Sequence, residues 1–222
     1  MAHCKIPAQE MTANASKNFA RAMKILEESG LLLVMGLEIP DVCRLVTSRR
    51  IKGSWWGDPA GQEIFAVSEM LSDHADITVT KLISGKVTFV HRKLWQKLVA
   101  VGKARDEWQM RNLTSQGKLL LRQLDKEGQL ITNKLGSSFG KRPGDTAREL
   151  ELRLLVHSDQ VHTDSGSHAK ILETWEHWAK RIGLRGKSLD SEHARRFFEK
   201  RIDEINKKNA GFGRIPWQPE KK

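Results

Sequence analysis

The order of helix and turn signals between residues 112 and 165 constrains the fold most strongly. Over residues 114–127, a capping threonine precedes leucines that recur on one helical face, and Gly128 ends the pattern. A short helix is expected over residues 132–135, and a basic, glycine-containing loop follows it. Asp145 can cap a longer helix through Leu155. The sequence therefore predicts three helices in close succession.

A strand and a turn are predicted directly after the third helix. Residues 155–163 alternate in polarity, and Asp164, Ser165 and Gly166 are typical of a turn. This order of elements is that of a winged helix-turn-helix, in which the third helix enters the major groove and the wing lies near the phosphates. We therefore predict a winged helix over residues 111–166, with residues 145–155 as the recognition helix.

The remaining residues favour an α+β protein that is mostly helical. Hydrophobic periodicity predicts further helices over residues 16–29, 41–49, 60–72, 91–101, 167–182 and 190–207. A buried strand is expected over residues 31–35, and a small β-hairpin is expected to turn at Ser84 and Gly85. The predicted domains are a helical region with the hairpin, the winged helix, C-terminal helices and a flexible tail, at 1–110, 111–166, 167–208 and 209–222.

Charge points to a polyanionic partner. The chain has 38 Lys and Arg residues against 27 Asp and Glu residues, which gives a net charge of +11. The first 110 residues carry a net charge of +3 and the remaining 112 carry +8. Because basic residues release the counterions of phosphates, this excess favours DNA as the partner and the second half as its binding region.

Other classes of protein find little support in the sequence. No apolar run reaches the roughly 18–20 residues of a membrane span, and Lys17 and Arg21 interrupt any signal peptide. Two cysteines are too few for a disulfide framework. Walker loops, dinucleotide fingerprints and nucleophile elbows do not occur. We therefore expect a cytoplasmic protein without a membrane association or a cofactor, and the residues favour a protein that is not an enzyme.

Basic and polar residues lie where the winged-helix model places DNA. They are found on the short helix, in the loop, on the third helix and on the wing. Asp145 and Glu149, near the start of the third helix, oppose phosphate binding. The predicted DNA contacts are Lys134, Lys141, Arg142, Thr146, Arg148, His162 and Ser165.

Two adjacent tryptophans occupy a loop rich in Gly and Pro. Trp55 and Trp56 could stack on a base or line a pocket for a flipped nucleotide, and Arg49, Arg50 and Lys52 lie nearby. The alternative is that the two indoles fill a seam between the helices and the hairpin. The sequence favours this packing role and leaves base stacking open.

Histidines and acidic residues crowd residues 157–168. His157, His162 and His168 occur with Asp159 and Asp164. On a strand, His157 and His162 would face opposite sides, and the spacing matches no zinc pattern. We therefore expect no metal site and interpret the histidines as part of a solvated wing.

A metal-dependent nuclease is a further alternative. Its candidate residues are Glu63, Asp73, Asp76 and Lys81. Such enzymes place two carboxylates and a lysine at one strand end. The residue two positions before Lys81 is Val79, where a carboxylate is expected. The acidic residues are better explained as the end of a helix and the start of a strand.

The second half resembles a known family. The stretch LTSQGKLLLRQLDKEGQLI…TARELELRLLVHSDQVHTDSGSHAKILETWEHWAKR, within residues 113–181, resembles the winged-helix segments of AlkZ/YcaQ-type bacterial DNA glycosylases and of their short relatives of unknown function. The segments GSWWGDPAGQEIF and KLISGKVTFVHRKLW of the first half are similar to those short relatives only. The resemblance implies a DNA-associated winged-helix protein.

The resemblance transfers no catalytic residue. Neither Gln129-Leu130-Ile131 nor Gln160-Val161-His162 matches the glutamine-containing catalytic motifs of the glycosylases. The leading interpretation is a DNA-binding protein with a regulatory or repair-associated role. The alternatives are a glycosylase-like enzyme with a Trp-lined pocket and a winged-helix scaffold that binds another protein or a second copy of itself.

Overall fold

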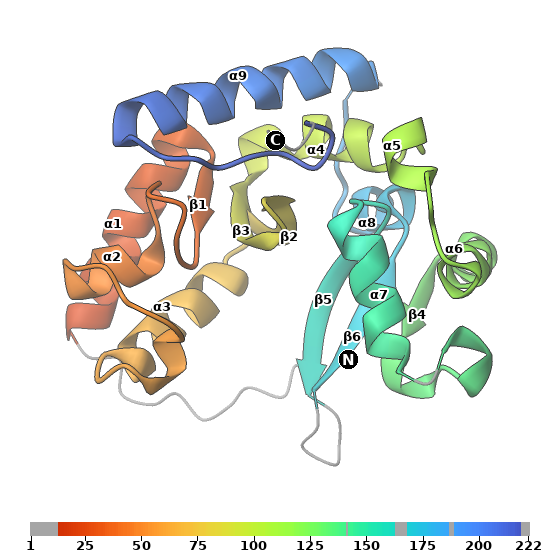
Figure 1. Cartoon of the computed structure of the whole chain (residues 1–222), viewed down its shortest axis with the longest axis horizontal. Helices are drawn as coiled ribbons and strands as arrows, with labels where there is room; N and C mark the ends of the chain where they lie inside the picture. Colours follow the sequence, from red (N-terminus) through yellow and green to blue (C-terminus); the bar gives the residue numbers. More distant parts are fainter. Residues whose placement is uncertain (1–12, 141, 163–167, 187–188, 219–222) are drawn as a thin grey trace. The chain divides into compact units, whose positions relative to one another are not determined.

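The structure is a computed structural model that describes residues 13–140, 142–162, 168–186 and 189–218, without the side chains of Val161, His162 and His168. In these residues the fold is α+β and mostly helical, with two antiparallel sheets of three strands each (Figure 1). The chain forms two compact units. The first comprises Met1–Val79, Lys86–Leu94 and Arg201–Gly213, and the second comprises Thr80–Gly85, Trp95–Lys200 and Arg214–Lys222.

The first unit contains three helices that pack on one another. Its elements are α1 (Ala13–Ser29), β1 (Leu31–Leu33), α2 (Val42–Thr47), the 3-10 helix η1 (Trp55–Gly57), α3 (Gly61–Ser72), the start of β2 (Ile77–Ile83), β3 (Lys86–His91), η2 (Arg92–Leu94) and the last part of α9 (Ser191–Asn209). The sheet has the order β1–β3–β2, and Leu32 pairs with Phe89. Aliphatic residues of the helices and of this sheet form the core, including Ala22, Leu26, Ile64, Val67 and Leu71.

The predicted hairpin is confirmed. Strands β2 and β3 are joined by Ser84 and Gly85, and both have positive φ angles, of 50° and 67°. Two consecutive residues with positive φ are typical of a type I′ turn, whose twist matches that of the strands. Glycine adopts this conformation without steric cost, so Gly85 suits the turn.

The second unit contains the elements of the predicted winged helix and the helices around them. They are α4 (Trp95–Gly102), α5 (Glu107–Met110), α6 (Ser115–Glu127), β4 (Gln129–Ile131), η3 (Thr132–Lys134), η4 (Ser137–Phe139), α7 (Pro143–Leu152), β5 (His157–His162), β6 (His168–Glu173), α8 (Trp175–Arg181) and the first part of α9 (Ser191–Asn209).

The start of α6 matches the prediction in detail. The Thr114 hydroxyl accepts a hydrogen bond from the Gly117 N–H at 3.0 Å, and Gly128, with φ of 75°, ends the helix. The leucine face of α6 is buried against α7 and the second sheet, in a core that includes Leu120, Leu121, Leu124, Ala147, Leu150 and Leu172. The cap therefore defines the start of α6, and the apolar face packs this helix on α7.

The second sheet has the strand order β4–β6–β5. Ile131 of β4 pairs with Ile171 of β6, and His162 of β5 pairs with His168 at the other end of β6. The predicted turn over residues 164–166 lies outside the described residues. The sheet places the two long strands side by side, directly after α7 in the chain.

One predicted helix is wrong at its start. Residues 167–182 were expected to be helical, but residues 168–173 form strand β6 and the helix begins only at Trp175. Strand β6 pairs on both sides, with β4 and with β5, so tertiary hydrogen bonding outweighs the local helical pattern. Thr174 separates the two elements, because its side chain accepts from the His177 N–H at 3.1 Å and caps α8.

The predicted flexible tail also differs from the structure. Ile215 is buried, and the Trp217 indole N–H donates to Glu199 Oε1 of α9 at 2.8 Å. The Trp217 ring also contacts Trp108, with 5.3 Å between ring centroids. Residues 214–218 therefore pack within the second unit, because two apolar side chains outweigh the Gly and Pro content that suggested a loose end.

None of the helices in the described residues combines the length and the apolar character that a membrane span requires.

Candidate nucleic-acid interface

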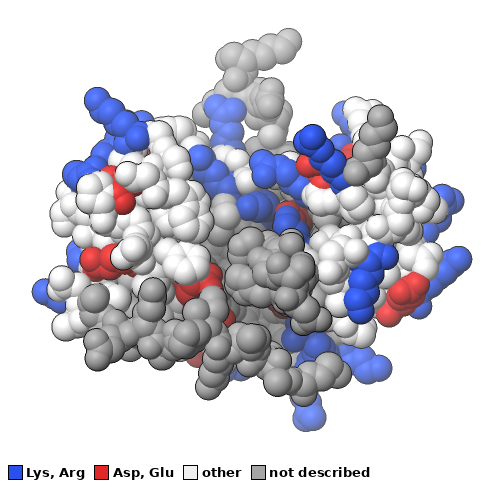
Figure 2. Space-filling model, turned by 90° about the horizontal axis from the view of Figure 1, so that it is seen from below, with Lys and Arg blue, Asp and Glu red and all other residues white. Residues whose placement is uncertain are grey.

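Three of the predicted DNA contacts are exposed cations. Lys134 ends η3, Arg142 is the N-cap residue of α7, and Arg148 lies on the exposed side of α7. Among the described residues, none of the three forms an ion pair or a side-chain hydrogen bond. Their charges are therefore available to a ligand. Figure 2 shows Lys and Arg side chains spread over one face of the molecule, with Asp and Glu side chains between them.

The first turn of α7 provides the backbone groups of a helix N-terminus. Pro143 lies within this turn, where its missing N–H costs no hydrogen bond, and no side chain caps the helix. Unpaired N–H groups and the helix dipole favour an anion at such an end. Asp145, which is exposed in the same turn, is the one described residue there that opposes an anion.

The prediction that Thr146 contacts DNA is not supported. Its exposed fraction is 9%, and its hydroxyl donates to the Phe139 carbonyl at 2.7 Å. The hydrogen bond joins α7 to η4, so Thr146 positions the short helical segment before α7. The sequence suggested a contact because Thr146 lies one turn into the helix, but its helical phase points it inward beside Ala147 and Leu150.

Three other predicted contacts cannot be placed. Lys141 and Ser165 lie outside the described residues. His162 lies on β5, where its backbone pairs with that of His168, and its side chain is outside the description.

Glu149 of α7 and Arg153, the C-cap residue of this helix, form contacts within the protein. Glu149 accepts hydrogen bonds from the backbone N–H and the hydroxyl of Thr114, at 3.0 and 2.5 Å, so it closes the start of α6. Arg153 donates to the carbonyls of Gln109 and Arg111, at 3.1 and 2.6 Å. Of the two carboxylates that were expected to oppose phosphate binding, Glu149 is therefore bound within the protein, whereas Asp145 is exposed.

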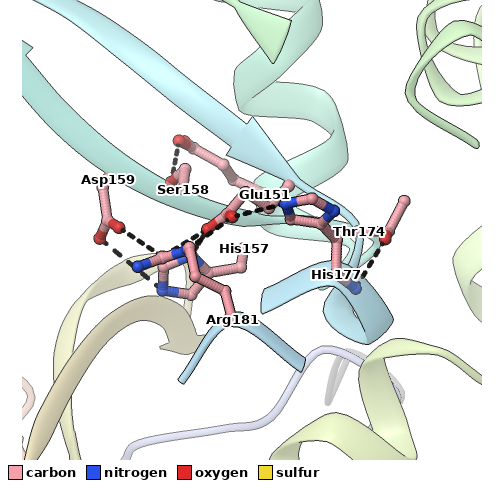
Figure 3. Close-up of polar contacts among 8 residues, drawn as sticks. Glu151, His157, Ser158, Asp159, Thr174, His177 and Arg181 are labelled. Carbon is pink, nitrogen blue, oxygen red and sulfur yellow. Dashed lines mark hydrogen bonds and ion pairs between the residues drawn. The ribbon is translucent and has the colours of Figure 1, made fainter. Parts of the chain in front are cut away.

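A network of charged side chains joins β5, β6 and α8 (Figure 3). Glu173 is fully buried, and Arg181 donates to both of its carboxylate oxygens, at 2.8 and 2.6 Å. The same guanidinium lies 3.4 Å from Asp159 Oδ2. Burial by itself would raise the pKa of Glu173, but hydrogen bonds from His157 and Arg181 outweigh it and lower the pKa to about 2.

This network includes three potential metal ligands. Ligand atoms of His157, Asp159 and Glu173 lie within 4.8 Å of one another. The His157 ring stacks on Trp178, with 4.7 Å between the ring centroids. Because the Arg181 guanidinium already occupies both oxygens of Glu173, a metal would have to displace a bidentate ion pair. We therefore interpret the cluster as an ion-pair network that fixes α8 on the sheet.

One tryptophan of the Trp55–Trp56 pair is packed against the protein, and the other is exposed. Trp55 is half-buried against the core of the first unit, whereas Trp56 is 65% exposed. Their rings stack with 4.0 Å between centroids, and Trp56 also contacts Phe65 at 5.6 Å. Arg49 pairs with Asp58 at 2.6 Å and so closes the loop that carries both rings. Trp55 thus fits the packing role, and Trp56 is the ring that a ligand can reach.

Two of the four residues considered for a nuclease, Glu63 and Asp76, form contacts within the first unit. Glu63 accepts from Asn18 Nδ2 at 2.8 Å, and Asp76 pairs with Arg92 at 2.9 Å. Asp73 is the C-cap residue of α3, as the sequence suggested. Lys81 belongs to the second unit, whereas these three acidic residues belong to the first. The contacts of Glu63 and Asp76 support structural roles for these two carboxylates.

The contacts of Glu151 were not predicted from the sequence. This buried carboxylate accepts hydrogen bonds from Lys170 Nζ, at 2.6 and 2.7 Å, and from the Ser158 hydroxyl at 2.7 Å. Helix periodicity placed Glu151 on α7 but gave no sign of its burial. The one available signal was its three-residue separation from Arg148, which puts both residues on neighbouring positions of the helix surface.

Comparison with known proteins gives one clear match. A search of curated proteins and a search of solved structures found no match. A family model described as "AlkZ related" matches residues 16–211. The sequence resemblance to the glycosylases themselves is limited to the second half of the chain. The family model, in contrast, also matches most of the first half. The chain therefore belongs to the AlkZ-related family.

Proposed function

We propose that residues 111–173 form a winged helix that binds duplex DNA, with α7 as the recognition helix and β5 and β6 as the wing. The order α6, β4, short helical turns, α7, β5, β6 supports this proposal, as does the strand order β4–β6–β5. In winged helices a short strand before the recognition helix joins the sheet of the wing. The proposed segment extends beyond the predicted boundary at 166, because β6 completes the sheet.

The observation that carries the proposal is the set of cations around the start of α7. Lys134, Arg142 and Arg148 are exposed and have no ion-pair partner among the described residues. By contrast, Glu149 and Glu151 are held inside the protein, by Thr114 and by Lys170. The surface that α7 offers to a ligand is therefore more positive than its sequence implies. Such a surface suits the phosphates on either side of a major groove.

DNA association also agrees with the family of the chain. AlkZ-type proteins are DNA glycosylases, and a repair-associated role for this chain is part of the proposal. The proposed activity is binding, since none of the placed residues repeats the glutamine-containing motifs of those enzymes.

The test is the affinity for a labelled 20-base-pair duplex, measured by fluorescence anisotropy at low salt. In the double variant Arg142→Glu/Arg148→Glu, affinity is expected to fall by at least about tenfold, because two phosphate contacts become repulsions. The matched control is Arg185→Glu, which makes the same change of charge at an exposed residue in the loop after α8.

The loss of affinity per reversed charge can be compared between the double variant and the control. If it is equal in both, binding depends only on the net charge of the protein. Absence of binding by the wild-type protein would favour the scaffold alternative, in which the same surface meets an acidic protein.

A second candidate function rests on the exposure of Trp56. A ring that is 65% exposed and already stacked on Trp55 can act as a platform for an unpaired base. We propose that it contributes to contacts with single-stranded or damaged DNA. Trp56→Ala is expected to weaken binding to a duplex with an abasic site more than to an intact duplex. Equal binding of the two substrates by the wild-type protein and the variant would exclude this role.

A further inference from the structure

The tip of the β2–β3 hairpin lies beside α7 within the second unit. A Cβ atom at Gly85 would come within 2.7 Å of Leu152 Cδ2, so the turn touches the last residue of α7 directly. On its other side, the Ser84 N–H donates to the Arg214 carbonyl at 2.7 Å. The hairpin tip is therefore fixed, and it brings Lys81 of β2 to the surface that carries α7.

The Lys81 side chain is half-buried, and its amino group donates to no acceptor among the described residues. Among the described residues, it forms no ion pair and no side-chain hydrogen bond. Burial lowers the pKa of Lys81, the charge of Glu151 raises it, and the charges of Lys170 and Arg148 lower it further. The charges of Glu151, Lys170 and Arg148 thus all act on Lys81, and three of these four groups are cations.

The one carboxylate in this cluster is already engaged. Glu151 is 5% exposed and accepts from Lys170 on both oxygens and from the Ser158 hydroxyl. Lys170 therefore balances Glu151. Lys81 and Arg148 remain as two positive charges without a counter-charge, next to the proposed recognition helix. Lys81 is half-buried and Arg148 is exposed. Two neighbouring cations repel each other, and an anion bound between them would relieve this repulsion.

We propose that Lys81 and Arg148 form an anion site that takes one phosphate of the DNA backbone. The proposal rests on the proposed function and adds a contact from the hairpin, which lies outside the winged-helix segment. The guanidinium of Arg148 can donate two parallel hydrogen bonds to phosphate oxygens, and the Lys81 ammonium supplies a second point of charge. The hairpin tip thereby becomes part of the DNA-binding surface and fixes the position of the duplex along α7.

The test compares Lys81→Met with Lys86→Met, a lysine on the next strand of the same hairpin. Affinity for the 20-base-pair duplex is measured by anisotropy over a series of salt concentrations. Lys81→Met is expected to weaken binding by about threefold to tenfold and to reduce the slope of log affinity against log salt by about 0.9. Lys86→Met removes the same charge from the same hairpin and is expected to weaken binding less, because Lys86 is not among the charges that act on Lys81. Circular dichroism and thermal unfolding show whether both variants are folded.

A second readout does not depend on affinity. Limited acetylation followed by mass spectrometry is expected to modify Lys81 in the free protein and to leave it protected in the DNA complex, while Lys86 stays reactive in both. If wild-type protein binds DNA, but Lys81→Met keeps the full salt slope and Lys81 is not protected, the inference is wrong and the proposed function stands.

Failure of the proposed function gives a different pattern. If wild-type protein does not bind DNA, calorimetric titration with inorganic phosphate decides the inference by itself. Binding that is lost in Lys81→Met would support an anion site for another phosphate ligand, and absence of heat in the wild-type protein would overturn it.

Discussion

Two groups of cations in the second unit behave differently. The first group, the bound cations, comprises Arg153, Lys170 and Arg181, each of which is held by carbonyls or by a buried carboxylate. The second group, the open cations, comprises Lys134, Arg142 and Arg148, which have no such partner among the described residues. Both groups lie in the same part of the sequence, between residues 134 and 181. This difference shows that a basic side chain is available to a ligand only where the fold leaves it without a partner.

The bound cations are expected to control stability. An ion pair that is removed from water costs desolvation energy, and losing one partner leaves the other charge buried. The open cations pay no such cost, and mutating exposed charges changes stability little. The predictions below test this division, beginning with the largest effect.

The largest effect is expected for Arg181→Met. This substitution leaves the fully buried Glu173 without its bidentate partner and should lower the free energy of unfolding by about 3–5 kcal/mol. Urea unfolding measures the change. The double variant Glu173→Gln/Arg181→Met should recover part of the loss, because no buried charge then remains. A single variant that costs less than the exposed-charge control Arg185→Met would contradict the division.

The second prediction concerns pH. The pKa of Glu173 is lowered from 4.5 to about 2 in the folded protein. A carboxyl with a lowered pKa stabilises the fold fully above its unfolded pKa, and this stabilisation is lost as the pH falls from 4.5 towards 2. The loss should amount to about 3 kcal/mol. Urea unfolding at pH 6, 4 and 3 should show a fall that is smaller in Glu173→Gln, and identical pH profiles would argue against the network.

A smaller effect is expected for Thr146→Val. The substitution keeps the shape of the side chain but removes the hydrogen bond to Phe139, which should cost about 1 kcal/mol of stability. Thr146→Ser keeps the hydroxyl and serves as the control. DNA affinity should stay within about twofold of wild type in both variants. A tenfold loss of affinity in Thr146→Val, with stability unchanged, would restore Thr146 as a DNA contact.

The smallest effect on stability is expected for Lys134→Met. Lys134 is exposed and unpaired, so the free energy of unfolding should change by less than about 0.5 kcal/mol. Duplex affinity should nevertheless fall by about threefold, because one phosphate contact is lost. Thermal unfolding and anisotropy on the same sample separate the two quantities. A clear loss of stability would mean that Lys134 has a partner in the folded protein and belongs with the bound cations.

Local signals in the sequence were sufficient for most elements. The cap at Thr114, the stop at Gly128 and the Ser84-Gly85 turn each depend on neighbouring residues, and all three are present as predicted. Strand β6 was missed because its pairing with β4 and β5 involves residues far apart in the chain. The threonine cap of α8 at Thr174 was the one local sign that the helix starts there.

The candidate interface was predicted in part. Arg142 and Arg148 are exposed as expected, whereas the burial of Thr146 depends on the exact phase of α7, which periodicity fixes only to within a residue or two. The approach of Lys81 to α7 follows from the fold of a hairpin that precedes it by more than fifty residues. Sequence spacing carries no information about such a contact.

The most direct test of the central claim is the salt dependence of duplex binding by the wild-type protein. If Lys81, Lys134, Arg142 and Arg148 each neutralise one phosphate, log affinity should fall against log salt with a slope of about −3 to −4. The result that would contradict the account is a slope close to zero, or no binding at the lowest salt at which the protein stays folded.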